Sequence, residues 1–423
     1  MERHSLGILA IVISSYLVLS ITGFCDDLLA AGGRGEDKSL PEVVLVDGES
    51  FHGKLVSISA HGAGESVAIF SLPNGSDRKI SLRDLWRIKF SSHEQVMDNP
   101  HQAVISFING GILSAYGIIL KNGKVSFTSS LVGKATVDVS MIDTICFLRS
   151  GHRASYVKNR VERMGPLSST QDHLIAENER GEWIPVPGVL KEIHSDRIIF
   201  QYDQADRTIG LDYVHMIQFA RIAHNKFAIA GEIIGKDGST LPFKSLQFKH
   251  GKMIISCERM QTELVRQVEL AEICFRSNRF VYLSDFTPVE VVQAGLFDIT
   301  FPFRMDRSSA GGPLKLAGTI YKKGLGLHSR CSVTYELKED FRLFVALVGI
   351  DDSTDGKGNA ELRILANGKD IIKPIILTAG VKPIPLRCNI QGVRRLTILV
   401  DFGPDHLDVG DHVDLVEARL VRK

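Results

Sequence analysis

The chain has 423 residues, enough for two to four domains of the usual ~100–200 residues each. Fifty basic residues stand against forty-nine acidic ones, which gives a formal net charge of +1. A chain so nearly neutral has no overall field to attract nucleic acid or an anionic membrane surface, so we expect neither as a partner of the folded part.

The N-terminal residues 1–31 are typical of an export signal. Arg3 precedes an uncharged apolar run from Leu6 to Phe24, and small residues follow it. The run is close to the ~20 residues that a spanning helix needs, so an uncleaved membrane anchor stays open as the alternative. In either case we expect the remaining chain to be extracytoplasmic, whether secreted, periplasmic or on the cell surface, with membrane contact only through this segment.

A pattern that ends on isoleucine, one variable residue and phenylalanine occurs four times between Glu42 and Phe275. We call these endings closures. The closures are Ile88–Phe90, Ile145–Phe147, Ile217–Phe219 and Ile273–Phe275. Their spacing predicts a duplicated pair of repeats over residues 42–147 and 172–275, separated by a polar, basic segment from Arg149 to Gln171.

The four repeats alternate apolar and polar residues and contain hairpin signals such as Asn122-Gly123, so they predict short strands. Their size and rhythm are similar to those of Sm-like or SH3-like small barrels. Only Glu258 to Glu272 has helical spacing, and it predicts either a short helix or a bent strand pair. Cys146 and Cys274 lie between the isoleucine and phenylalanine of two closures, which predicts surface or edge thiols.

The last third of the chain contains the motifs Tyr282–Phe286, Gly324–Ser329, Gly349–Asp352, Asp411–Asp414 and Val416–Leu420. In this order and spacing they resemble the NPCBM family, a group of carbohydrate-binding modules often attached to bacterial glycosidases. The resemblance implies a jelly-roll (galactose-binding-like) β-sandwich over residues 280–423 and a glycan or polysaccharide ligand. The whole chain is therefore expected to be all-β, with four small β-barrel-like or β-sheet repeats before the sandwich.

Gly324 and Gly326 suit a tight bend between strands, because glycine adopts positive φ at little cost. His328 follows them, and it either hydrogen-bonds a sugar hydroxyl or locks the loop by bonding to the backbone. Cys331 and Cys388 allow either a disulfide or two buried apolar side chains.

The loop from Asp351 to Asn359 concentrates carboxylates and turn-forming residues after a predicted strand. Asp351, Asp352 and Asp355 could hold a structural Ca²⁺, which prefers six to eight oxygen ligands. The spacing does not match an EF-hand loop. The alternative is a solvated turn whose aspartates accept hydrogen bonds from backbone N–H groups.

The segment Asp401 to Asp414 is the most acidic part of the chain, and carboxylates accept charge-assisted bonds from sugar hydroxyls. Leu415 stands where the family motif commonly has tryptophan. This departure predicts the loss of an aromatic platform, and the two tryptophans, Trp86 and Trp183, both lie in the repeats. The predicted carbohydrate contacts are His328, Asp351, Asp352, Asp411, His412 and Asp414.

Three functions follow from these features. The favoured hypothesis is a non-catalytic extracytoplasmic protein whose sandwich binds carbohydrate. The second is a structural or adaptor protein of the bacterial cell envelope, whose repeats bind protein partners while the sandwich has lost sugar affinity, as the Leu415 departure suggests. A glycoside hydrolase that uses Asp401 to Asp414 is a distant third, because no recognisable catalytic motif accompanies the module. We therefore predict no catalytic residues.

Overall fold

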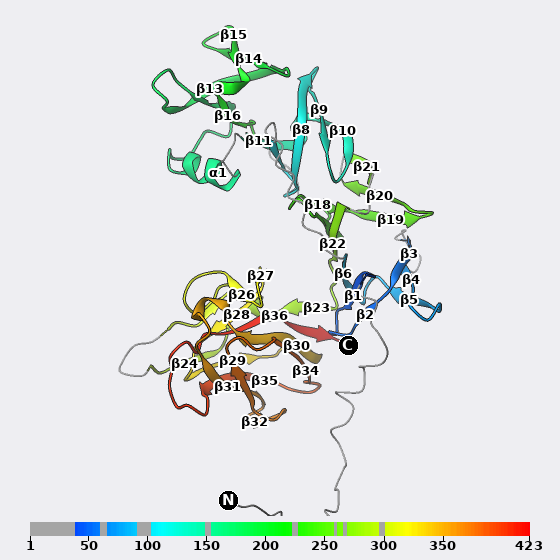
Figure 1. Cartoon of the computed structure of the whole chain (residues 1–423), viewed down its shortest axis with the longest axis vertical. Coiled ribbons are helices and arrows are strands. Elements are labelled where there is room, and N and C mark those ends of the chain that lie inside the picture. The colour runs from blue at the N-terminus through cyan, green and yellow to red at the C-terminus, as the bar shows by residue number, and fades with distance from the viewer. Residues whose placement is uncertain are drawn as a thin grey trace, which may run out of the picture. The chain divides into compact units, whose positions relative to one another are not determined.

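The computed structural model describes residues 39–59, 66–90, 103–148, 154–221, 227–257, 260–264, 269–295 and 301–423. The predicted export signal or anchor lies outside these residues, as does part of the segment from Arg149 to Gln171. In the described ranges no helix is both long and apolar enough to cross a bilayer. The fold is nearly all β, as the alternating pattern predicted (Figure 1).

Each repeat forms a unit of antiparallel strands in which the first strand pairs with the closure strand. Unit 1 consists of β1 (Glu42–Leu45), β2 (Ser50–His52), β3 (Lys54–Ser59), β4 (Val67–Ser71), β5 (Asp77–Ser81) and β6 (Leu85–Lys89). Unit 2 consists of β7 (Ala103–Phe107), β8 (Ile112–Lys121), β9 (Lys124–Ser129), β10 (Gly133–Asp138) and β11 (Ile142–Phe147), with the short turn η2 (Val139–Met141).

The second half of the repeat region repeats this strand order. Unit 3 consists of β12 (Asp172–Glu177), β13 (Trp183–Ile193), β14 (Arg197–Tyr202), β15 (Ala205–Gly210), η3 (Leu211–Tyr213) and β16 (Val214–Gln218). Unit 4 consists of β17 (Gly231–Gly235), β18 (Thr240–Phe243), β19 (Ser245–Lys249), β20 (Lys252–Cys257), β21 (Met260–Leu264) and β22 (Leu270–Phe275). Of the described residues between 258 and 272, Met260–Leu264 and those from Leu270 onward form strands, the first paired with β20 and the second with β17 and β6.

The closure strands pair with each other across units. In β11 and β16, Ile145 lies opposite Ile217, so unit 2 joins unit 3. In β22 and β6, Ile273 lies opposite Ile88, so unit 4 joins unit 1. In the sequence the repeats form the pairs 42–147 and 172–275. In the sheets, however, unit 2 is joined to unit 3 and unit 4 is joined to unit 1.

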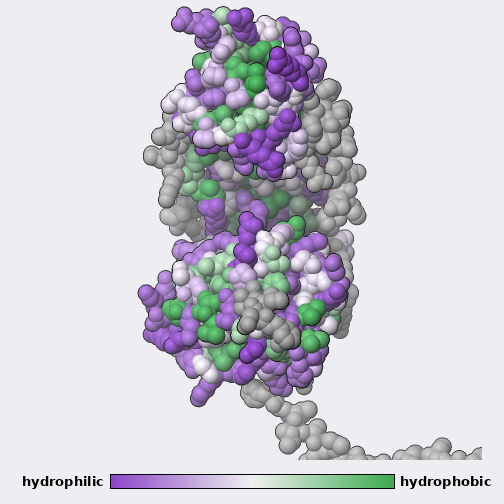
Figure 2. Space-filling model, turned by 90° about the vertical axis from the view of Figure 1, so that its left-hand side faces the viewer, coloured by the Kyte–Doolittle hydropathy of each residue, from purple (hydrophilic) through white to green (hydrophobic). Residues whose placement is uncertain are grey.

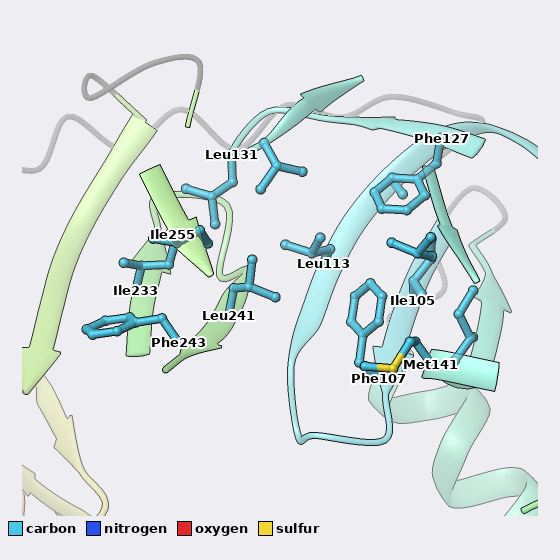
Figure 3. Close-up of a cluster of buried hydrophobic side chains, with 14 of the residues drawn as sticks. Ile105, Phe107, Leu113, Phe127, Leu131, Met141, Ile233, Leu241, Phe243 and Ile255 are labelled. Carbon is cyan, nitrogen blue, oxygen red and sulfur yellow. The ribbon is translucent and has the colours of Figure 1, made fainter. Parts of the chain in front are cut away.

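One continuous hydrophobic core runs through all four units. Figure 3 shows where units 2 and 4 meet: Leu113 and Leu131 of unit 2 lie near Leu241 of unit 4, between the separate side-chain clusters of the two units. Among the residues that the structure describes, the pair of Ile112 in β8 and Thr240 in β18 joins the same units in the sheet. The apolar faces of the strands therefore bury one another.

Cys146 is a buried residue, so its prediction as a surface thiol was wrong. The helix α1 (Ala154–Glu162) covers the outer face of the closure strand and packs Val157 and Val161 beside this thiol. Burial raises the pKa of Cys146 to about 11. Cys274 is partly buried, and its strand β22 has a neighbour on each side, so it is not on a sheet edge.

The last domain is a sandwich of two antiparallel sheets. One sheet contains β25 (Arg304–Met305), β28 (Gly324–Leu327), β36 (Val413–Arg422), β30 (Phe341–Ile350) and β34 (Ile384–Asn389), with β23 (Phe280–Tyr282) beside β36. The other contains β24 (Glu290–Gln293), β29 (Cys331–Glu336), β35 (Arg395–Phe402), β31 (Asn359–Ala366) and β32 (Lys369–Asp370), with β33 (Ile375–Thr378) beside β31. The hairpin β26 (Leu314–Leu316) and β27 (Thr319–Tyr321) and the turns η5 (Leu283–Asp285) and η6 (Asp352–Thr354) complete it.

A second hydrophobic core fills the space between the two sheets of the sandwich. Cys331 and Cys388 belong to it as buried, free thiols, which is the second of the two alternatives for them. Gly324 and Gly326 lie within β28 and not in a bend, so that prediction was wrong. Close packing explains Gly326, because a Cβ there would lie only 2.3 Å from the carbonyl oxygen of Arg307.

Candidate functional site

The sheet topology gathers the predicted site residues at one end of the sandwich. Val413, the first residue of β36, lies opposite Leu327 at the end of β28 and opposite Ile350 at the end of β30. Because these neighbours are antiparallel, the residues just after β28 and β30 meet those just before β36. The three side chains brought together in this way are His328, Asp351 and His412.

The second sheet contributes loops to the same end. Ala360 of β31 lies opposite Phe402 of β35, so the loop after β35 starts beside the start of β31. The Oδ1 atom of Asp411 accepts a hydrogen bond from the backbone N–H of Asn359 at 2.8 Å. At Gly358 an added Cβ would lie 2.2 Å from the carbonyl oxygen of Gly410, so glycine allows the loops 351–358 and 403–412 to pack closely.

Asp351 and Asp414 form a buried carboxyl pair. Both accept a hydrogen bond from the backbone N–H of Lys315, at 3.1 Å and 3.1 Å. Burial and the neighbouring Asp351 raise the pKa of Asp414 to about 10, so Asp414 is protonated at neutral pH. Burial opposes ionisation of Asp351 as well, yet hydrogen bonds from Asp414 and Ser353 outweigh it and lower the pKa of Asp351. The pair therefore shares one proton and ties the β26–β27 hairpin to the sandwich.

Asp411 fixes a loop in a similar way. Its side chain is fully buried, and burial raises its pKa to about 6. Through its bond to Asn359 it connects the loop 403–412 with β31. Its Oδ2 atom is buried and has no hydrogen-bond partner among the described residues.

Asp352 points to the hairpin and not into a metal cage. Its carboxylate accepts from the backbone N–H groups of Ala317 at 3.0 Å and Gly318 at 2.7 Å, two turn residues with positive φ. Asp355 is exposed in a left-handed conformation. Within the residues that the structure describes, no group of three or more His, Cys, Asp or Glu side chains is placed to hold a metal ion. The predicted Ca²⁺ cage of Asp351, Asp352 and Asp355 is therefore not formed.

The two histidines belong to an uncharged aromatic cluster. His328 is buried and stacks on Phe301 with ring centroids 4.4 Å apart, while His412 meets both rings edge-on. Burial, together with the nearby His412, lowers the pKa of His328 to about 4, and burial also lowers that of His412. The Nδ1 atom of His412 lies 2.6 Å from the Oγ atom of Ser309. His412 is only half-buried, so it remains accessible from solvent.

The solvent-facing part of this end also includes side chains that were not among the predicted carbohydrate contacts. Leu407 and Val409 of the loop 403–412 are 51% and 58% exposed, and Asp408 between them is half-buried. Figure 2, which views the left-hand side of Figure 1, shows hydrophilic and hydrophobic residues interspersed on the sandwich. Phe301 and Ser309 could not have been found from motifs, because they join the cluster only through the fold.

The position of Leu415 bears on the predicted loss of an aromatic platform. Its side chain is fully buried in the core of the sandwich, so a residue at this position faces the opposite sheet and not a ligand. The expectation that Leu415 replaces an exposed aromatic platform was wrong. Neither tryptophan offers an open face either: Trp86 lies between two arginine side chains, and Trp183 lies between Arg160 and the ring of His215.

Comparison with known proteins identifies the sandwich. Residues 279–421 match the NPCBM/NEW2 domain family, which confirms the resemblance. A provisionally named endo-alpha-N-acetylgalactosaminidase of Renibacterium salmoninarum is 31% identical over 90 residues, which cover 21% of this chain and 6% of that protein. Alpha-1,3-galactosidase B of Akkermansia muciniphila is 26% identical over 117 residues, which cover 26% of this chain and 15% of that protein.

Among solved structures, a CBM51 module of a Clostridium perfringens GH95 protein, in complex with methyl-galactose, is similar to part of this chain. The identity is 22%, the TM-score is 0.31, and the match covers 34% of this chain and 99% of that one. The chain spans only a small part of the length of the two curated relatives that it matches.

Proposed function

We propose that the protein is an extracytoplasmic, non-catalytic carbohydrate-binding protein whose ligand is a glycan or polysaccharide. The observation that carries this proposal is the NPCBM/NEW2 match over residues 279–421. The curated relatives are named as glycosidases that act on galactosyl or N-acetylgalactosaminyl linkages, and their similarity is confined to short stretches. Such stretches suit a binding module that accompanies different catalytic domains.

We infer that the ligand binds at the loop end of the sandwich, where rigid strands present variable loops. The buried Asp351, Asp411 and Asp414 support these loops and are too deep to reach a sugar. Direct contacts would come from accessible groups, above all the half-buried His412 and Asp408. Of the six predicted contacts, His412 and the exposed Asp352 are the ones that solvent can reach.

The buried carboxyl pair also argues against hydrolysis. A glycosidase needs two carboxyl groups about 5–10 Å apart that flank the scissile bond. Asp351 and Asp414 are 1% and 0% exposed and already share their proton and a backbone donor, so no glycosidic bond can enter between them. The envelope-adaptor alternative loses its sequence argument, because Leu415 is a core residue.

The test is binding of the full-length protein to an array of plant, microbial and host glycans. We expect retention on at least one glycan, and Asp408→Asn and His412→Ala should weaken it about tenfold by removing one hydrogen-bonding group each. Asp340→Asn is the matched control, because Asp340 precedes β30 and so lies at the opposite end of the sandwich. No retention on any glycan, or equal retention by all variants, would contradict the proposal, and hydrolysis of reporter glycosides would refute the non-catalytic role.

A further inference from the structure

A cationic cleft of about 500 Å³ lies where unit 1 meets the sandwich. Its walls include four basic side chains, Lys79, Arg279, Arg342 and Lys423, and two acidic ones, Asp47 and Asp84. This volume is within the ~300–1,000 Å³ that small-molecule sites occupy. The cleft is separate from the loop end of the sandwich, because Arg342 and Lys423 lie at the start of β30 and just beyond the end of β36, away from Asp351 and His412.

Close packing fixes the border of this cleft. The side chain of Trp86 lies between the guanidinium groups of Arg87 and Arg419, at 3.7 Å and 3.8 Å. The Nε atom of Arg419 donates to the carbonyl oxygen of Val46, a cleft residue, at 2.9 Å. A small buried apolar cluster that includes Val44, Trp86, Phe280 and Val421 continues this contact. The cleft is therefore a formed feature between two packed walls.

The two arginines of the cleft have unused donors. Arg279 is 3.7 Å from the nearest oxygen of Asp84, and Arg342 is 3.6 Å from that of Asp47, both beyond hydrogen-bond distance. The Nε atoms of both arginines are buried without a hydrogen-bond partner among the described residues. Asp47 instead accepts from Arg387 at 3.0 Å. The side chains of Arg279 and Arg342 are 32% and 36% exposed, so the other N–H donors of their guanidinium groups are open to an acceptor in the cleft.

We propose that this cleft binds an oxyanion, the sulfate, phosphate or carboxylate group of a small ligand, through Arg279 and Arg342. The planar guanidinium group presents N–H donors in a fork that matches two oxygens of such a group. Lys79 and Lys423 also line the cleft, and Lys423 is paired with Asp340 at 3.4 Å. The site is independent of glycan binding at the loop end of the sandwich, so either can fail without the other.

The test is titration of inorganic phosphate with the full-length protein, followed by the phosphorus NMR line width of the ion. Competition by inorganic sulfate and by glucuronate then identifies which oxyanion the cleft prefers. We expect saturable broadening, and Arg279→Gln and Arg342→Gln should each weaken it about tenfold by removing a charged donor. Arg221→Gln, an exposed arginine paired with Asp143 in another part of the chain, should leave it unchanged.

Arg342→Lys provides a further readout, because it keeps the charge and the packing but loses the fork of donors. It should bind more weakly than the wild type and more tightly than Arg342→Gln. Circular dichroism checks that each variant is folded. The absence of saturable binding, or equal binding by the wild type and both glutamine variants, would overturn the proposal.

Discussion

The shared proton of Asp351 and Asp414 predicts a specific dependence of stability on pH. The pKa of Asp414 is about 10 in the folded protein, against ~3.9 in an unfolded chain. Between these values the folded form keeps a proton that the unfolded form releases, so the free energy of unfolding falls as pH rises. One proton gives a slope of about 1.4 kcal/mol per pH unit, hence a loss of about 3 kcal/mol from pH 7 to pH 9.

Asp414→Asn should remove this slope. The asparagine side chain has nearly the shape of a protonated carboxyl group, and its NH₂ group can donate to Asp351 at any pH. Below about pH 4, where the unfolded wild type is protonated as well, we expect the substitution to cost about 1 kcal/mol, since only one hydrogen bond changes. At pH 9 the variant should equal or exceed the wild type in stability.

The assay is urea unfolding of the full-length protein at pH 7, 8 and 9, followed by circular dichroism. Other titrating groups are common to both proteins, so the difference between wild type and Asp414→Asn isolates this carboxyl group. Asp340→Asn, which removes an exposed carboxylate, should keep the wild-type slope. Equal slopes in the wild type and Asp414→Asn would refute the shared proton.

Three further predictions concern other buried groups. The pKa of Asp411 is raised to about 6, so the free energy of unfolding should fall as pH rises from about 4 to 6, by at most about 1.4 kcal/mol per pH unit. In Asp411→Asn the free energy of unfolding, measured by urea unfolding, should depend less on pH in this range. His328 should change stability in the opposite direction, because its pKa of about 4 lies below the ~6.5 of an unfolded chain. The free energy of unfolding should therefore fall as pH falls through this range, and it should fall less in His328→Gln. Arg419→Met should lower the free energy of unfolding by about 1–3 kcal/mol, because the carbonyl of Val46 loses a buried donor; tryptophan fluorescence would report it, and an unchanged midpoint would contradict the packing around Trp86.

The strands were predictable because alternation is a local property. Ile145 and Ile273 are correctly assigned to closure strands, since every second residue of such a strand faces the core. The partners of the closure strands were not predictable, because four similar edges are equally able to pair. The burial of Cys146 depended on α1, a short helix with no strong signal in the basic segment before unit 3.

The sequence indicated which loops meet at one end of the sandwich, but it did not indicate how deeply their aspartate side chains are buried. Motif order was enough to bring the loops of Asp351 and Asp411 to one end of the sandwich. Whether a loop aspartate faces solvent or the backbone depends on the N–H donors that the fold supplies, here those of Lys315 and Asn359. For the same reason the sequence did not show that Leu415 is a core residue, because its burial follows from its place in β36.

The most direct test of glycan binding at the loop end is a hydrogen-exchange footprint of the full-length protein with and without a retained glycan. We expect slower exchange in the loops 301–309, 328–330 and 403–412 when the glycan is present, and unchanged exchange in the four repeat units. Protection confined to the repeats, with no change in those three loops, would contradict the proposed binding site.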